Sequence, residues 1–211
     1  MMDHRIGTFH LTGGEASASP WIPSYVEESV GGTREIDLRT RHFSDRRLFL
    51  TGEVDDRMAN DFVSQILFLS KEKKPVDIFL SSPGGSVNAG LVIYDLIQSC
   101  DFPVNIYCTG MAYSMGAVLL AGGQKGRRFI LPHSKVMIHE PLIAGGMGGS
   151  ATSVKKTAEN ILEVKALINE LLLRHTGKSA EEIDEATAFD NFMNAEGAIA
   201  FGIVDEIKIV I

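Results

Sequence analysis

Residues 76–120 pass twice from an apolar run through a glycine-rich turn into a helical pattern: VDIFLSSPGGSVNAGLVIYDLIQSCDFPVNIYCTGMAYSMGAVLL. The apolar runs, Val76–Leu80 and Val104–Cys108, have the length and composition of buried strands. A helix follows each turn, over about Val87–Gln98 and through Ala117–Leu120. Strands that alternate with helices in this way predict a parallel sheet with helical crossovers, and therefore an α/β fold.

The flanking segments extend this alternation in both directions. Upstream, a strand at Leu48–Leu50 precedes a helix that Asp55 or Asp56 can cap. Downstream, the apolar runs Phe129–Leu131 and Lys135–His139 predict two further strands. The core is therefore expected to be one continuous α/β domain.

A glycine-rich stretch at residues 145–149 leads into a long helix from roughly Thr152 to His175, with Gly177 at the C-cap position. Its apolar stripe is made by Val154, Ala158, Ile161, Leu162, Ile168, Leu171 and Leu172. Such a stripe either covers the core of the same chain or packs against another subunit, and the sequence leaves both open.

Composition excludes several classes of function. The 211 residues carry a net charge of -7, which disfavours a nucleic-acid surface because phosphate binding needs clustered Lys and Arg. The longest apolar stretch, Met111–Gly123, is too short to span a membrane. With Cys100 and Cys108 as the only cysteines, a reducing cytoplasm is the expected location.

The N-terminal part is expected to differ from the rest. Residues 1–25 are rich in Gly, Ser and Pro and predict a flexible leader, followed by one domain over residues 26–211. The charged segment Glu35–His42 is expected to be weakly structured.

Three residues suggest chemistry. Ser114 lies where a strand turns into a helix, so that neighbouring backbone amides are free to bind the anion that forms during acyl transfer. Taken alone, such a serine is more often only a helix cap. His139 ends a strand in a position suited to a general base, and Asp190 lies between Phe189 and Phe192, where partial burial and an imidazole partner are expected.

Four blocks resemble, in order, the signatures of the Clp proteolytic subunit. They are SPGGSV at 82–87, GMAYSMGA at 110–117, MIHEP at 137–141 and DNFMNAEGA at 190–198. The likeness extends over roughly residues 30–207. Four ordered blocks together are a much stronger signal than any one of them.

This resemblance implies a crotonase-like α/β fold, a spiral of parallel sheet with helical crossovers and a projecting helix handle. It implies Ser114 as nucleophile, His139 as general base and Asp190 as the acid that orients it. The backbone amides of Gly85 and Met115 would then form the oxyanion hole. No metal or other cofactor is implied for this chain.

The resemblance also implies partners. Seven-membered rings of this chain, or of this chain and a paralogous subunit, would stack into a tetradecamer. An AAA+ unfoldase of the Clp family would hydrolyse the ATP and deliver unfolded polypeptides. Phe189 stands where many family members carry arginine, which predicts a double ring held by apolar contacts or by a paralogous partner instead of an ion pair there.

Three alternative functions are disfavoured. A crotonase-type acyl-CoA enzyme would share the fold but would not need the Ser-His-Asp set, whereas a non-catalytic ring subunit would be expected to lose one of its members. A simple acidic binding domain would leave the four blocks unexplained. Two local signals do not indicate a site. TGKS at 176–179 lacks the rest of a phosphate-binding loop, and Asp55-Asp56 with Glu53 is better explained by helix capping than by a metal.

Overall fold

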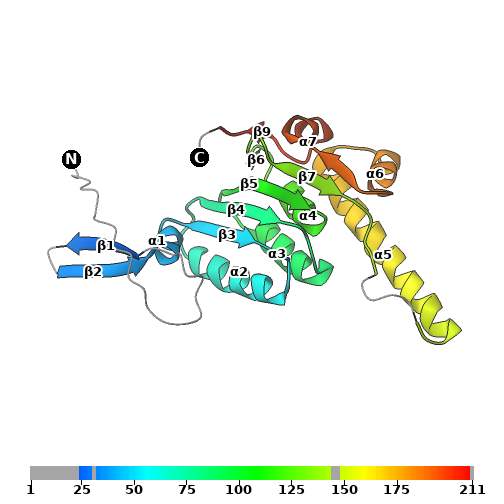
Figure 1. Ribbon diagram of the computed structural model, residues 1–211, viewed down its shortest axis with the longest axis horizontal. Coiled ribbons are helices and arrows are strands. Elements are labelled where there is room, and N and C mark those ends of the chain that lie inside the picture. Colours follow the sequence, from blue (N-terminus) through cyan, green and yellow to red (C-terminus); the bar gives the residue numbers. More distant parts are fainter. Residues whose placement is uncertain (1–23, 30–31, 144–147, 210–211) are drawn as a thin grey trace. The chain divides into compact units, whose positions relative to one another are not determined.

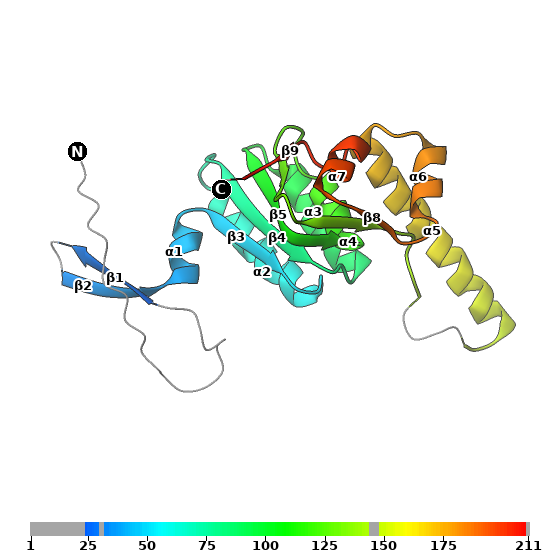
Figure 2. The same ribbon diagram turned by 45° about the horizontal axis from the view of Figure 1, so that its top comes forward.

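The computed structural model describes residues 24–29, 32–143 and 148–209 (Figures 1 and 2). It divides into two compact units, Met1–Leu48 and Phe49–Ile211. The predicted leader lies outside the described residues except for Ser24 and Tyr25, which begin the first strand. Most of the glycine-rich stretch at 145–149 also lies outside them.

The first unit contains a hairpin and a short helix. Strand β1 (Ser24–Ser29) pairs antiparallel with β2 (Gly32–Asp37), and helix α1 (Leu38–Ser44) follows directly. Asp37 caps this helix by accepting the Thr40 amide at 2.9 Å. The expectation that Glu35–His42 is weakly structured was therefore wrong, because strand pairing and a helix cap supply backbone hydrogen bonds that charge content does not reveal.

The second unit is built on a mostly parallel sheet with the strand order β3-β4-β5-β6-β9, and β7 and β8 extend it from β5. The strands are β3 (Arg47–Thr51), β4 (Val76–Ser82), β5 (Val104–Tyr113), β6 (Arg128–Ile130), β7 (Lys135–Ile138), β8 (Asn191–Met193) and β9 (Glu206–Ile207). The pairs β4–β5, β5–β6, β5–β7 and β6–β9 are parallel, and β7–β8 is antiparallel. The predicted parallel sheet of a crotonase-like fold is confirmed.

Helices pack around this sheet. They are α2 (Asp56–Leu69), α3 (Val87–Ser99), α4 (Met115–Ala121), α5 (Ala151–Thr176), α6 (Ala180–Thr187) and α7 (Ala195–Phe201). Figure 1 shows α2 and α3 side by side under the strands. All seven residues of α4 are buried, as expected for a helix that is apolar on every side. Among the described helices, none is long and apolar enough to cross a membrane.

The predicted helix ends are found where the sequence places them. Asp55 caps α2 by accepting the Met58 amide at 2.7 Å. Gly177 ends α5 in the left-handed conformation with φ of 74°, and Ser179 then starts α6. The TGKS segment therefore ends one helix and begins the next.

Strand β5 is longer than predicted, and its register against β4 shifts in its middle, where a bulge bends the strand. The sequence suggested an end at Cys108, but the strand continues to Tyr113, with Gly110 at φ of 108°. The buried Ser134 stabilises the bend: its Oγ accepts the Gly110 amide at 2.7 Å and donates to the Cys108 carbonyl at 3.1 Å. Because of the bend, Ile106–Cys108 pairs with β6 and Met111–Tyr113 pairs with β7.

Aromatic rings on four neighbouring strands form a stack. Phe49, Phe79, Tyr107 and Phe129 follow one another with ring centroids 5.3, 5.3 and 4.9 Å apart. They come from β3, β4, β5 and β6 in turn, so that the stack reinforces the strand order through cross-strand contacts.

The apolar stripe of α5 was expected either to cover the core of the same chain or to pack against another subunit, and the two halves of the helix differ in this respect. Ile168, Leu171 and Leu172 are buried against the body of the second unit, so the C-terminal half is a cover helix. Within α5, which the structure describes from end to end, no residue before Ile168 is buried, and the side chain of Leu162 is 63% exposed. The N-terminal half extends beyond the sheet and its other helices (Figures 1 and 2).

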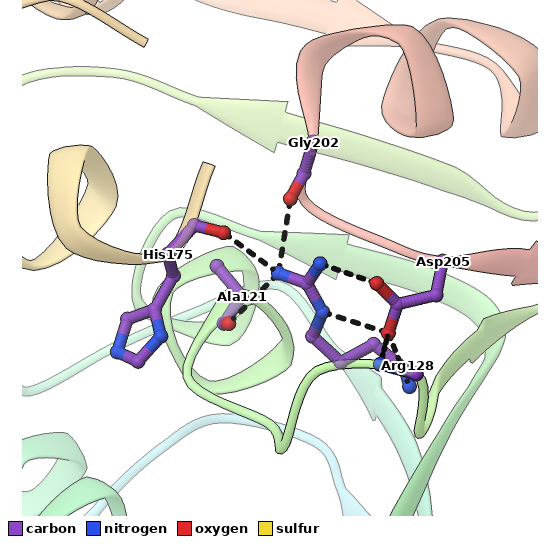
Figure 3. A network of polar contacts seen from close by, with 6 residues as sticks. Ala121, Arg128, His175, Gly202 and Asp205 are labelled. Carbon is purple, nitrogen blue, oxygen red and sulfur yellow. Dashed lines mark hydrogen bonds and ion pairs between the residues drawn. The ribbon is translucent and has the colours of Figure 1, made fainter. Parts of the chain in front are cut away.

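A buried arginine joins the C-terminal ends of three helices to the last strand (Figure 3). Arg128 forms a bidentate pair with Asp205, with Nη2 to Oδ1 at 2.5 Å and Nε to Oδ2 at 3.0 Å. Its Nη1 lies 2.9–3.2 Å from the carbonyl oxygens of Ala121, His175 and Gly202. These residues lie at the C-terminal ends of α4, α5 and α7, so one guanidinium binds carbonyls that have no helical partner.

We expect Arg128→Met to lower the free energy of unfolding by about 3–5 kcal/mol, because it leaves a largely buried carboxylate and three carbonyls without their donor. Urea denaturation followed by circular dichroism measures this. Lys73→Met, which removes an exposed pair with Asp101, is the control and should leave the midpoint unchanged.

The loss should also depend on pH. Burial alone would raise the pKa of Asp205, but its hydrogen bonds and charge interaction with Arg128 outweigh this and bring the pKa below 3.8. A lowered carboxyl pKa stabilises the fold above pH 3.8, and this stabilisation is lost as the pH falls through the lowered value. The difference between wild type and variant should therefore shrink in acid, and a constant difference would contradict the assignment.

Candidate active site

Ser114 occupies a strained turn between β5 and α4. Its φ of 53° and ψ of -122° lie outside the regions that residues with a side chain normally adopt, and such a conformation costs about 1–3 kcal/mol. The turn is held by the Ser114 amide, which donates to the Met137 carbonyl at 2.8 Å, and by the Ser114 carbonyl, which accepts the Ala117 amide at 2.9 Å. The side chain makes no cap bond to α4.

Strand register brings the three predicted site residues together. Met137 of β7 pairs with Tyr113 on one side and with Phe192 on the other. Ser114 follows Tyr113, and the pair Ile138↔Asn191 places Asp190 across from His139. Tyr113 and Phe192 also touch edge to face at 5.5 Å, which ties the outer two of these strands together.

The three side chains form a continuous hydrogen-bonded chain. His139 Nε2 lies 2.8 Å from Ser114 Oγ, and His139 Nδ1 lies 3.0 Å from Asp190 Oδ1. A carboxylate accepts the Nδ1 proton, so the neutral ring presents an unprotonated Nε2 to the serine hydroxyl. This is the arrangement in which imidazole can remove a proton from an attacking hydroxyl.

The environment of Asp190 differs from the expectation. The side chain is 60% exposed, and Phe189 and Phe192 on either side are exposed as well. The expected partial burial was wrong, because both rings are directed away from the core in a segment at the edge of the sheet. Asp190 is therefore positioned by its backbone and by the hydrogen bond to His139, not by enclosure.

The turns that carry the Gly85 and Met115 amides lie close together. Val54 accepts the Ser86 amide at 2.7 Å and donates to the Gly84 carbonyl at 2.8 Å, a parallel bridge that turns the Gly85 amide away from Val54. A methyl group added at Gly84 would lie 3.1 Å from the Met115 nitrogen. In the described part of the chain, neither the Gly85 nor the Met115 amide donates to a protein acceptor.

An apolar pocket opens beside Ser114 and His139. Most of its lining comes from α4, the end of β7 and the C-terminal half of α5. The other lining residues are Val87, Met115, Val118, Ile138, Pro141, Ile168 and Leu172. Such a lining suits an apolar side chain whose neighbouring carbonyl lies at Ser114.

The other candidate groups have structural roles. Across the described ranges, no group of three or more His, Cys, Asp or Glu residues could hold a metal ion. At the end of α5, burial, followed by the charges of Arg128 and Arg174, lowers the pKa of His175, and its Nε2 lies 2.7 Å from the Tyr94 hydroxyl.

The model of the Clp protease family matches residues 30–209, which is most of the chain. The chain belongs to the Clp protease family. The resemblance of the four sequence blocks is thereby confirmed.

Family membership indicates a serine peptidase, a hydrolase of peptide bonds. Clp proteases generally form oligomeric rings and work with Clp ATPases.

Two parts of the site are not predicted from the sequence. They are strand β8, which sets the position of Asp190, and Val54, which orients Gly85. The alternation of burial in β8 extends over only three residues, too few to give a strand signal.

We expect Gly84→Ala to slow the labelling of Ser114 by a fluorophosphonate by about 100-fold or more. The added Cβ would lie 2.6 Å from Ser114 Cβ and 2.8 Å from the Tyr113 carbonyl, so the serine must move. Gly126→Ala is the matched control, because Gly126 also has a positive φ but has open space around it. Equal labelling of the two variants would show that Gly84 does not position Ser114.

Proposed function

We propose that this chain is the subunit of a self-compartmentalising serine endopeptidase, with Ser114 as nucleophile, His139 as general base and Asp190 as its orienting acid. The observation that carries the proposal is the pair of contacts from His139, at 2.8 Å to Ser114 and 3.0 Å to Asp190, next to an apolar pocket. The substrates are unfolded polypeptides that a Clp-family AAA+ unfoldase delivers.

The geometry supports a two-stage hydrolysis. Ser114 Oγ attacks the peptide carbonyl while His139 Nε2 takes its proton, and Asp190 stabilises the imidazolium that forms. The amides of Gly85 and Met115 bind the oxyanion of the tetrahedral intermediate. When the C–N bond breaks, His139 returns the proton to the leaving amine and an acyl-enzyme remains on Ser114.

Deacylation repeats these steps with water. His139 removes a proton from the water that attacks the acyl carbon, and then protonates Ser114 Oγ as the ester bond breaks. The pocket favours substrates with an apolar side chain next to the scissile bond. Each step uses side chains and amides of this chain alone, and ATP is consumed by the partner unfoldase.

The assembly we propose is a tetradecamer of two stacked seven-membered rings, formed by this chain or by this chain with a paralogous subunit. The exposed N-terminal half of α5 supports a contact between subunits, since Leu162 lies there without cover. Phe189 is 85% exposed and offers a second apolar contact beside the active site. Active sites inside such a chamber are accessible only to unfolded chains.

A crotonase-type acyl-CoA enzyme is the alternative with the same fold. It would use the turns around Gly85 and Met115 to bind a thioester oxygen. The hydrogen-bonded chain from Ser114 through His139 to Asp190 favours the peptidase, because acyl-CoA chemistry on this fold does not require it. A non-catalytic ring subunit is disfavoured because such a subunit would be expected to lose one of these three residues.

We expect Ser114→Ala to abolish hydrolysis of fluorogenic peptides, because the variant lacks the attacking oxygen. The fold should remain intact, since only a hydroxyl without a cap bond is removed. Turnover and fluorophosphonate labelling test activity, and circular dichroism tests the fold. Unchanged turnover or full labelling in the variant would place the nucleophile elsewhere.

We expect Leu162→Asp to split stacked rings, because it places a charge in an apolar contact between subunits. Leu172, on the same stripe, is buried in its own subunit and is unsuitable for this test. Asn160→Asp adds the same charge to the other side of α5 and should leave the assembly unchanged. Native mass spectrometry distinguishes the outcomes, and intact double rings in Leu162→Asp would count against the interface.

A further inference from the structure

Lys165, in the middle of α5, binds two carboxylates that come from different parts of the fold. Its Nζ lies 3.0 Å from Glu140 Oε2 and 2.9 Å from Asp184 Oδ1. The side chain is only 25% exposed. Hydrogen bonds to Asp184 and then Glu140 raise the pKa of Lys165, so it remains a cation throughout the neutral range.

The two carboxylates belong to the two sides of the candidate active site. Glu140 directly follows His139, and its amide donates to the carbonyl of Thr187 at 2.7 Å. Asp184 lies on α6, and Thr187 is the last residue of that helix, three residues before Asp190. Lys165 therefore joins the end of β7 to the helix that leads into Asp190.

Asp190 needs such support because little else encloses it. Its side chain is largely exposed, and the preceding Phe189 is also exposed and therefore contributes little packing. The following residue, Asn191, donates from its side chain to the Ala186 carbonyl of α6 at 3.1 Å. The position of Asp190 relative to His139 thus depends on the β7–β8 pairing that follows it and, on its N-terminal side, on where α6 lies relative to the end of β7.

We propose that Lys165 is a positioning residue for the hydrogen bond between His139 and Asp190. Its ammonium binds Glu140 and Asp184, and so keeps the end of β7 and α6 at the separation at which the His139 imidazole can hydrogen-bond to the Asp190 carboxylate. This inference rests on the proposed function for its effect on catalysis, but the structural tie can be measured without any activity.

Substitutions at Lys165 have opposite expected effects. Lys165→Met leaves Glu140 and Asp184 facing each other without the cation, and two neighbouring carboxylates repel. Lys165→Arg keeps a cation with several donors for both. Adding Glu140→Gln to Lys165→Met removes one of the opposing charges and should restore part of what the single variant loses.

The experiment compares kcat and KM for a fluorogenic peptide across these variants. We expect kcat to fall about tenfold in Lys165→Met with KM within about twofold, because the triad and not the pocket is misplaced. Lys165→Arg and the double variant should recover most of the loss. Lys73→Met is the control: its exposed pair with Asp101 lies outside α5 and outside the candidate site, so kcat should not change.

Hydrogen exchange of the Glu140 amide, followed by NMR, gives the readout that is independent of activity. This amide should exchange faster in Lys165→Met than in wild type or Lys73→Met. An unchanged exchange rate, or an unchanged kcat in an active enzyme, would overturn the inference. So would an equal loss in the Met, Arg and double variants, since that would mark a purely structural role.

Failure of the proposed function would appear differently. A wild-type chain that neither cleaves peptides nor reacts with fluorophosphonate would refute the peptidase assignment. The Glu140 amide would still report whether Lys165 ties β7 to α6. The two ideas can therefore fail separately.

Discussion

The backbone hydrogen bonds on both edges of β7 are the constraint on which the candidate site depends. Met137 pairs with Tyr113 on one side and with Phe192 on the other, so a single residue fixes the alignment of three strands. Since side chains alternate between the faces of a strand, a slip of one residue on either edge would direct His139 or Asp190 to the wrong face. The chemistry at Ser114 therefore begins with the register of a four-residue strand.

That register depends in turn on parts of the core that carry no chemistry. The bend of β5 at Gly110, held by the buried Ser134, lets one strand pair first with β6 and then with β7. Helix α4, which begins beside Ser114, ends at a carbonyl that Arg128 binds. Buried polar groups thus hold both ends of the short strand–turn–helix unit that presents the serine.

Much of the central fold could be predicted from the sequence, because its strands and helices carry strong apolar patterns. Apolar runs predicted the strands around Val76–Leu80 and Lys135–His139. Capping residues predicted the helix ends at Asp55 and Gly177. The placement of Ser114 and His139 at the ends of strands also follows from the sequence alone.

The remainder depends on tertiary contacts that no local pattern encodes. Strand β8 forms because β7 offers an unpaired edge, and three residues cannot signal a strand by themselves. Gly110 marks a bend within a strand, although a glycine after an apolar run ordinarily suggests an end. The exposure of Asp190 and the double pairing of Lys165 arise from residues far apart in the chain.

The strained backbone of Ser114 has an evolutionary consequence. Glycine adopts a positive φ without the steric penalty that a serine side chain brings, so glycine would make this turn more stable. Stability and reactivity therefore favour different residues at the same position, and serine persists only while selection for the hydroxyl outweighs the strain. In a duplicated copy released from catalysis, this position would be among the first to drift, and glycine there would mark a copy kept for its architecture alone.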